Sequence, residues 1–300
     1  MIQKIRLIDV DGHNFPNLPL MKISAYYKNS GCDVDWYNPL IDWYDPPDKV
    51  FMSKVFTFSP DYQHPVCGKE IIKGGTGYSY PSGGKTLPDE IEHIYPDYKL
   101  YPQYKNTAYG FLTRGCPRGC DFCIVKEKEG RKSVKVADLS EFWHNQKNIV
   151  LLDPNMFACT DWKDLSMQLI ESKAWVDFSQ GCDIRIMNAE KTQYLKQIKV
   201  KQVHFAWDRY EDKEIIVPKF KTVKEILGWD KKRLPVYVLT NFNTTIEQDL
   251  ERIYTLRDFG YWPYVMIYNK QSTRPGDPLR RLQRWVNMRS VFENVTKFED

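Results

Sequence analysis

Residues 108–123 read AYGFLTRGCPRGCDFC, an apolar run that passes directly into a loop holding three cysteines. The segment Ala108–Thr113 has the short, apolar and aromatic character of a buried strand. Two glycines and a proline in the following loop allow its backbone to fold tightly. We therefore expect a strand whose carboxyl end carries Cys116, Cys120 and Cys123.

Similar short strands recur along the rest of the chain and alternate with helical patterns. This alternation predicts a parallel sheet built from right-handed βαβ units. Six strands are fewer than the eight of a full barrel, so we expect a partial (β/α)6, TIM-like barrel over residues 107–270 and a C-terminal helical extension over 271–300. The expected strands are 108–113, 149–152, 175–178, 203–207, 236–239 and 264–267, and the expected helices 136–144, 161–171, 189–197, 219–227 and 244–259.

The first part of the chain has a separate pattern. Strands are expected at 4–10, 33–37 and 49–58, with a helix at 18–29. Residues 1–95 are therefore interpreted as a small α/β domain. Residues 96–106 are rich in proline and tyrosine and lack periodicity, which is typical of a linker.

Composition excludes several classes of protein. Of the 300 residues, 42% are hydrophobic and 27% charged, which are the values of a folded globular chain. The mean hydropathy is −0.55 and no long apolar run occurs, so we expect no transmembrane helix. Lys and Arg number 43 against 39 Asp and Glu, an excess of four that neither requires nor excludes nucleic acid. The N-terminus lacks signal-peptide features and the seven cysteines are an odd number, so a reducing, cytoplasmic location is expected.

Three thiolates on one short loop suit an iron–sulfur cluster. A four-iron cluster takes four ligands, and protein thiolates commonly supply them. Three cysteines would leave one iron open for a substrate or cofactor. A structural zinc site is the alternative, and it would need a fourth ligand such as His144 or Cys159.

The cysteine spacing resembles that of the radical S-adenosylmethionine (SAM) superfamily. In that family three cysteines are separated by three and then two residues, with an aromatic residue before the last, as Cys116, Cys120, Phe122 and Cys123 are here. The resemblance implies a [4Fe–4S] cluster that cleaves SAM to a 5′-deoxyadenosyl radical, which abstracts hydrogen from a substrate. It also implies an electron donor such as flavodoxin or ferredoxin. Neither the substrate nor a catalytic residue follows from the sequence.

The resemblance extends in part to residues that would bind SAM. Asp153 follows the second barrel strand, where many members have Gly-Gly-Glu, and it could accept the methionine ammonium with Asn155 in support. After the third strand, Gln180, Asp183 and Arg185 resemble residues that contact the ribose and carboxylate of SAM. A plain turn at Asp153 and an internal Asp183–Arg185 ion pair are the alternative interpretations.

The N-terminal domain resembles a reduced, Rossmann-like cobalamin-binding domain. Cobalamin-binding members carry Asp-x-His-x-x-Gly, and Asp11 and His13 match that motif, whereas Pro16 replaces the glycine. A solvated His13 is therefore favoured over cobalamin. A cobalamin-dependent methyltransferase remains the alternative within the enzyme class.

The C-terminal segment combines basic and aromatic side chains: Arg280, Arg281, Arg284, Trp285 and Arg289. Such a segment could contact RNA phosphates, so nucleic acid is not excluded as a partner. Leucine and valine residues at helical spacing favour an ordinary amphipathic helix instead. A non-catalytic zinc or iron–sulfur module, with nucleic acid as a possible ligand, is the alternative from another functional class.

Overall fold

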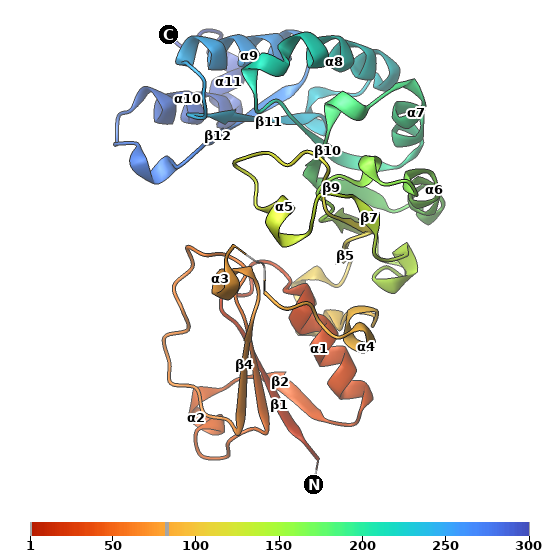
Figure 1. Ribbon diagram of the computed structural model, residues 1–300, viewed down its shortest axis with the longest axis vertical. Coiled ribbons are helices and arrows are strands. Elements are labelled where there is room, and N and C mark those ends of the chain that lie inside the picture. Colours follow the sequence, from red (N-terminus) through yellow and green to blue (C-terminus); the bar gives the residue numbers. More distant parts are fainter. Residues whose placement is uncertain (1, 82–83, 300) are drawn as a thin grey trace. The chain divides into compact units, whose positions relative to one another are not determined.

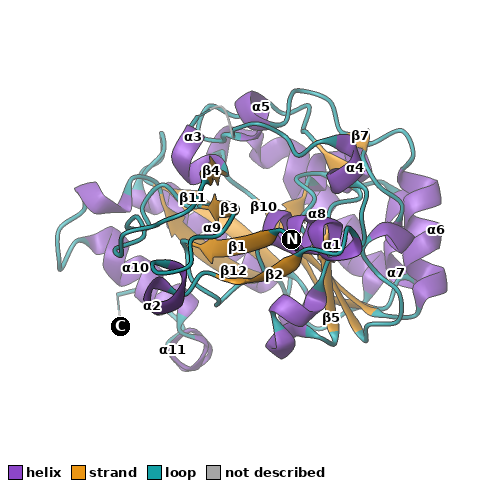
Figure 2. Cartoon of the chain, turned by 90° about the horizontal axis from the view of Figure 1, so that it is seen from below, coloured by secondary structure: helices purple, strands orange, loops and turns teal. Residues whose placement is uncertain are grey.

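The computed structural model describes residues 2–81 and 84–299. The chain is a mixed α/β protein whose two main sheets contain parallel strand pairs. It divides into two compact units, Met1–Val150 and Leu151–Asp300, whose helices and strands are drawn in Figures 1 and 2. Within the described residues, no helix has the length and apolar character needed to cross a membrane.

The N-terminal unit begins with a four-stranded sheet in the order β2-β1-β3-β4, and all three strand pairs are parallel. Its strands are β1 (Lys4–Asp9), β2 (Asp33–Trp36), β3 (Lys49–Ser53) and β4 (Glu70–Gly74), and its helices are α1 (Leu18–Asn29), α2 (Pro39–Asp42), α3 (Thr76–Ser79) and α4 (Asp89–Glu92). The expected strand at 49–58 ends early, because the backbone N–H groups of Val55 and Phe56 donate to the Asp11 carboxylate instead of to a strand.

Both a hydrogen-bonded cap at its first turn and the burial of its apolar side chains favour helix α1. The side chain of Asn17 accepts a hydrogen bond from the N–H of Leu20, which satisfies one unpaired donor of the first turn. Gly31, with φ of +78°, lets the chain turn back after the helix ends. Ile5 and Leu7 of β1 are almost completely buried, which places the core of this unit beside its central strand.

A second group of elements in this unit holds the cysteine loop. These elements are β5 (Thr107–Gly110), β6 (Thr113–Arg114), α5 (Val125–Lys128), β7 (Val134–Lys135) and β8 (Asn148–Leu151). The expected strand 108–113 is thus interrupted after Gly110. Strand β6 pairs antiparallel with β7, forming a hairpin that the sequence did not reveal. Two short 3-10 turns, Tyr98–Leu100 and Pro102–Tyr104, precede β5.

The helix expected at 136–144 is wrong. Only a 3-10 turn, Leu139–Glu141, forms there, and Asp138 and Glu141 close it as a capping box. The Phe142 ring then packs so closely on Gly110 that a Cβ at that glycine would lie 2.4 Å from the ring. Burial of Phe142 against β5 therefore ends the turn before a helix can develop.

The C-terminal unit alternates helices and strands as the sequence predicts. Its strands are β9 (Trp175–Cys182), β10 (Val200–Ala206), β11 (Pro235–Thr240) and β12 (Trp262–Ile267), and its helices are α6 (Trp162–Ser172), α7 (Ala189–Gln197), α8 (Lys213–Leu227), α9 (Ile246–Asp258), α10 (Pro278–Asn287) and α11 (Arg289–Asn294). These four strands lie in the order β9-β10-β11-β12, so each strand neighbours its predecessor in the chain. The pairs β9–β10, β10–β11 and β11–β12 are parallel.

The two faces of strands β9–β12 differ in character. Val176, Phe178, Val203, Phe205, Val236, Val238, Val265 and Ile267 alternate along these strands and are buried. Helices α8 and α9 lie along one side of the strands (Figure 1). Asp177, His204 and Tyr237, at positions of the opposite parity, are polar or aromatic and half-buried, and Tyr264 has 44% of its surface accessible. The sheet therefore has one apolar face and one face able to meet polar groups.

Helix α8 begins earlier than expected and includes Pro218. Proline lacks the N–H for one helical hydrogen bond, which disfavours it inside a helix. Ile216 and Phe220 on either side of it are almost completely buried, so packing outweighs that loss. At the C-terminus, Leu282, Trp285 and Val286 of α10 are buried against α9 and β12, as expected of an amphipathic helix docked on the sheet.

Candidate functional site

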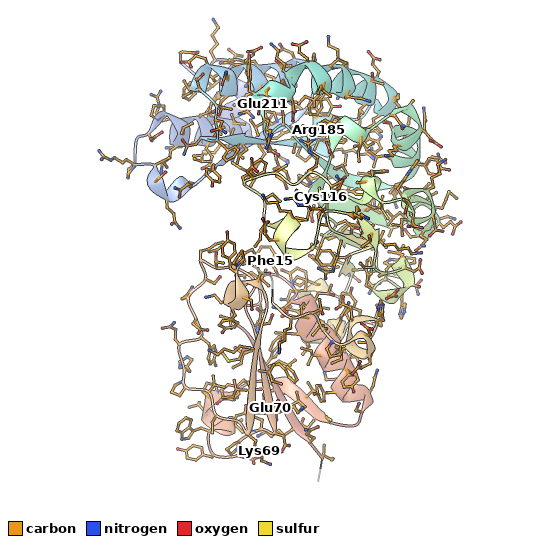
Figure 3. All side chains as sticks on the ribbon, viewed as in Figure 1. Phe15, Lys69, Glu70, Cys116, Arg185 and Glu211 are labelled. Atoms are coloured by element: carbon orange, nitrogen blue, oxygen red, sulfur yellow. The ribbon has the colours of Figure 1, made fainter. Side chains whose placement is uncertain are left out.

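The three cysteines lie on the loop between β6 and α5, and Figure 3 labels the first of them, Cys116. Gly115 and Gly119 have φ of +82° and +59°, which favours glycine. A Cβ at Gly115 would lie 2.1 Å from the Lys132 carbonyl oxygen, and one at Gly119 would lie 2.6 Å from the Arg131 guanidinium. Gly115 is therefore required by the close approach of the backbone that returns into β7, whereas Gly119 is favoured by its positive φ, since the Arg131 side chain could move.

The loop presents three partly buried thiols on a fixed backbone. The N–H of Cys116 donates to the carbonyl oxygen of Gly130 at 3.2 Å, and that of Cys123 donates to the carbonyl of Cys120 at 3.1 Å. Phe122, just before the last cysteine, is also partly buried. Three thiols so close in sequence are the donor type that iron–sulfur clusters use. Across residues 2–81 and 84–299, no three His, Cys, Asp or Glu side chains are grouped to hold a single metal ion.

Positive charge is concentrated around this loop. Between positions 113 and 135 there are seven Lys and Arg residues and three acidic residues. The largely buried Glu129 accepts from the Arg114 guanidinium and from the Gly115 N–H, each at 3.3 Å, so it ties the loop's first residues to its last turn. Burial lowers the pKa of Lys128, although Glu129 opposes that shift. The excess of cations favours binding of a negatively charged thiolate complex.

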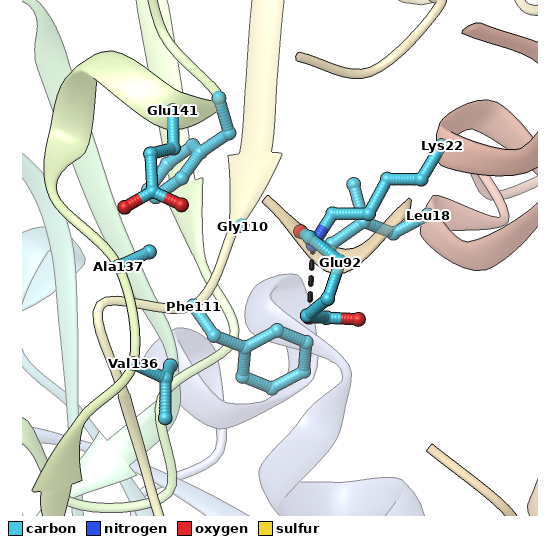
Figure 4. A pocket seen from close by; sticks show the side chains of 9 residues that line it. Leu18, Lys22, Glu92, Gly110, Phe111, Val136, Ala137 and Glu141 are labelled. Atoms are coloured by element: carbon cyan, nitrogen blue, oxygen red, sulfur yellow. Dashed lines mark hydrogen bonds and ion pairs between the residues drawn. The ribbon is translucent and has the colours of Figure 1, made fainter. Parts of the chain in front are cut away.

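A small cavity in the N-terminal unit adjoins this group of elements (Figure 4). It is lined by Leu18, Lys22, Glu92, Gly110, Phe111, Val136, Ala137, Glu141 and Phe142. Lys22 and Glu92 form an ion pair at 2.9 Å across it. Its volume of about 10 Å³ is that of one water molecule, so it is too small to bind an organic substrate.

Asp153 and Asn155 follow β8 and are both buried, with 5% and 1% of their surface accessible. The thiol of Cys182, at the end of β9, lies near enough to the carboxylate of Asp153 for that charge to affect the pKa of the thiol. Burial raises the pKa of Cys182, and the charges of Asp153 and Asp183 raise it further. Both carboxylates are therefore close to the same buried thiol. The Ser179 hydroxyl donates to the Leu151 carbonyl at 2.8 Å and connects the two strand ends.

The Asp183–Arg185 ion pair that the sequence left open is present. The Arg185 Nε donates to Asp183 Oδ1 at 2.7 Å, and its Nη1 pairs with the Asp212 carboxylate. Burial lowers the pKa of Arg185, but the two carboxylates outweigh it and the net shift is upward. The structure thus brings Asp153, Asp183 and Arg185 together near Cys182, with Arg185 already neutralised by two acids.

Gln180 lies apart from that group, on a bulge in β9. Phe178 and Cys182 of β9 pair with Val203 and Phe205 of β10, so the three residues 179–181 of β9 lie opposite the single residue His204 of β10. Gly181 within the bulge has φ of +107°, and Gln180 is exposed. Bulges occur often next to active sites, where they redirect side chains.

Sequence reasoning missed a row of polar and aromatic side chains on the less apolar face of the C-terminal sheet. His204 Nδ1 is 3.8 Å from Asp177 Oδ1, and the His204 ring stacks on Tyr237 with centroids 5.0 Å apart. Tyr237 in turn meets Tyr264 edge to face at 5.9 Å. Burial raises the pKa of Asp177, and the charges of His204 and Lys201 oppose that shift. The placement of these residues in alternation with buried apolar residues on four successive strands is the signal that would have found them.

In the N-terminal unit, the residues matched to a cobalamin motif are engaged within the protein. Asp11 accepts from the N–H groups of Val55 and Phe56. The exposed His13 lies against Trp36, with ring centroids 4.2 Å apart. Neither contact favours a role in cobalamin binding.

Asp9, at the end of β1, is an unusual carboxyl. Burial raises its pKa to about 6, although a 2.7 Å hydrogen bond from the Tyr101 hydroxyl lowers it. Between pH 4 and 6 the folded protein therefore holds a proton that the unfolded chain releases. Stability from this group is present below about pH 4, falls as the pH rises to about 6, and is constant above that.

We expect Asp9→Asn to stabilise the protein by about 1–3 kcal/mol at pH 7, because the amide avoids the buried charge and still accepts from Tyr101. Urea unfolding at a series of pH values measures this. The gain over the wild type should vanish near pH 4, and Asp35→Asn, at an exposed position, should show none. Equal stability of Asp9→Asn and the wild type at pH 7 would show that the Asp9 charge carries no such cost.

Comparison with known proteins gives one distant likeness. No protein-family model and no curated protein matches the chain. One of the matching solved structures is the crystal structure of Streptococcus suis SuiB bound to S-adenosylmethionine, with 12% sequence identity and a TM-score of 0.43. The match covers 70% of this chain and 52% of that one, so the chain spans about half the length of the solved structure it matches. A likeness of this strength assigns neither a family nor an activity.

Proposed function

We propose that the chain is a radical SAM enzyme, built as a partial (β/α)6 barrel preceded by a small Rossmann-like domain. Cys116, Cys120 and Cys123 bind a [4Fe–4S] cluster and leave one iron free for SAM. The observation that carries this proposal is the loop itself. Its three thiols lie within eight residues, Gly115 is imposed by the close approach of the returning backbone, and Gly119 is favoured by its positive φ.

When bound, the cluster supplies the electron that cleaves SAM to methionine and the 5′-deoxyadenosyl radical, which removes a hydrogen atom from the substrate. The protein's part is to bind the cluster, orient SAM and exclude water. The cations around the loop stabilise the negative charge of the thiolates. Glu129 fixes the loop by holding Arg114 and Gly115.

For SAM, we propose that Asp153 accepts the methionine ammonium and that Asn155 supports it. Asp153 is buried, so its contact with a cation is little screened by solvent. Asp183 makes a polar contact with the ribose or the carboxylate of SAM. Arg185 holds the Asp183 side chain in position through the 2.7 Å hydrogen bond from its Nε. Because Arg185 already binds two acids, it acts in this proposal as a positioning residue. Gln180 and Phe122 remain proposed SAM contacts on position alone.

We expect Asp153→Asn to weaken SAM binding ten- to a hundred-fold while iron content stays unchanged. Asparagine keeps the size of the side chain but loses the charge-assisted contact, which is typically worth about 1.5–3 kcal/mol. Calorimetric titration of the reconstituted protein with SAM measures the affinity. Asp164→Asn, at an exposed position of α6, is the matched control and should bind as the wild type does. Unchanged affinity in Asp153→Asn would show that the residue only forms a turn.

A further inference from the structure

An open hollow lies between the edge strand β12 and helix α10 of the C-terminal unit. Its volume is about 390 Å³, within the range of small-molecule sites. Its lining residues are Tyr264, Lys270, Arg280, Gln283, Arg284 and Asn287. Three of the six are cations and none is acidic. The proposed radical chemistry uses none of them.

The walls of this hollow are fixed by hydrogen bonds to one strand residue. Asn287 Oδ1 accepts from the Val265 N–H at 2.8 Å, and its Nδ2 donates to the Val265 carbonyl at 3.0 Å. Gln283 Nε2 donates to the same carbonyl at 3.0 Å. These side-chain amides satisfy the backbone N–H and carbonyl of Val265 at the open edge of β12, and they hold α10 against that strand. The spacing between the Tyr264 side and the α10 side is thereby set without a ligand.

Besides β12 and α10, the turn that contains Lys270 lines the hollow, and hydrogen bonds from Arg280 hold this turn in place. The Arg280 guanidinium donates to Thr273 Oγ1 at 2.8 Å, to the Thr273 carbonyl at 2.9 Å and to the Lys270 carbonyl at 3.2 Å. All of these acceptors are uncharged. Among the residues that the structure describes, Arg280 makes no ion pair, and its positive charge contributes to the potential in the hollow.

Two further cations face no acidic partner. Arg284 and Lys270 are exposed, and neither makes an ion pair with another described residue. Other arginines nearby lie over aromatic rings: Arg281 over Phe298 and Arg289 over Trp262. Among these C-terminal cations, Arg284 and Lys270 are thus available to an anion from outside the chain.

An aromatic ring completes the hollow. Tyr264 is 44% exposed, and its edge-to-face contact with Tyr237 fixes the ring orientation. A planar group can stack on such a ring, while Arg284 matches the oxygens of a phosphate in a bidentate manner. We propose that this hollow binds a small phosphorylated compound with a planar ring, of nucleotide size. Its limited volume favours a single nucleotide over a polymer.

Titration of the full-length protein with UMP tests this proposal, with uridine and inorganic phosphate as probes for the two halves of the ligand. We expect saturable UMP binding, and binding about ten-fold weaker or worse for each half alone. Arg284→Gln and Tyr264→Leu should each weaken UMP about ten-fold. Arg281→Gln is the matched control on the same helix and should bind UMP as the wild type does.

Three results would overturn the proposal. The first is an absence of saturable UMP binding by the wild type. The second is equal weakening by Arg281→Gln and Arg284→Gln, which would mean general attraction to a basic surface. The third is tighter binding of an oligouridylate than of UMP, lost in Arg284→Gln, which would assign the hollow to RNA. Because Arg284 and Tyr264 are exposed, both variants should fold, and thermal melting checks that they do.

Discussion

Replacing Cys120 by alanine is expected to leave the protein without iron after anaerobic reconstitution. The wild type should bind about four iron and four sulfide ions per chain. Two thiolates on this loop are too few for a stable cluster that already has one iron without a protein ligand. Iron and sulfide assays, with absorption in the visible range, measure the loss.

Cys67→Ala is the matched control, because Cys67 is also partly buried in the N-terminal unit and lies far from the loop in sequence. It should retain the iron of the wild type, as should Cys32→Ala. Thermal melting without metal should be nearly the same for all three variants, since each loses only a small, partly exposed side chain. Full iron in Cys120→Ala would remove the cluster assignment, and one zinc per chain in a colourless wild type would support the metal-binding module instead.

Replacing Arg252 by methionine is expected to destabilise the protein by about 3–5 kcal/mol. Arg252 and Asp249, both on α9, are completely inaccessible to solvent and form an ion pair at 2.5 Å. The same guanidinium donates to the carbonyls of Trp207 and Leu239 at 2.6 and 2.8 Å. Arg252 therefore joins the ends of β10 and β11 to α9, and its loss leaves a buried carboxylate and these carbonyls without their donor.

Thermal melting measures this effect, and the expected fall in Tm is about 6–20 °C, since each kcal/mol shifts Tm by about 2–4 °C at this size. Arg274→Met, at an exposed position, should melt close to the wild type. Adding Asp249→Asn to Arg252→Met should recover part of the loss, because the unpaired charge is removed. A fall in Tm no larger than that of Arg274→Met would contradict the role assigned to this ion pair.

The sequence predicts the alternation of helices and strands in the C-terminal unit well. Buried parallel strands are apolar runs in the sequence, and these runs can be recognised without knowing how the strands pack. The prediction of a helix fails at 136–144. There the local helical pattern is overridden by the packing of Phe142 on Gly110, a residue distant in the sequence. The break after Gly110 has the same origin, since the β6–β7 hairpin depends on a partner twenty residues away.

Some candidate site residues can likewise be identified from the sequence, whereas others depend on contacts that only the fold brings about. The cysteine spacing is a local property and is visible in the sequence alone. The position of Gln180 is not, because it depends on a bulge that exists only in the register between β9 and β10. Asp177 and His204 alternate with apolar residues, which the sequence shows, but the structure alone reveals that they lie on the less buried face of the sheet. Arg185 could be assigned a positioning role only when Asp212, twenty-seven residues later, was found beside it.

The most direct test of the proposed function is the analysis of products when the reconstituted protein is reduced with dithionite in the presence of SAM. We predict slow formation of 5′-deoxyadenosine and methionine in equal amounts by the wild type and by Cys67→Ala, and none by Cys120→Ala. Chromatography separates these products from S-adenosylhomocysteine. S-adenosylhomocysteine as the main product, or intact SAM with a protein that carries its full iron, would contradict the proposed radical cleavage.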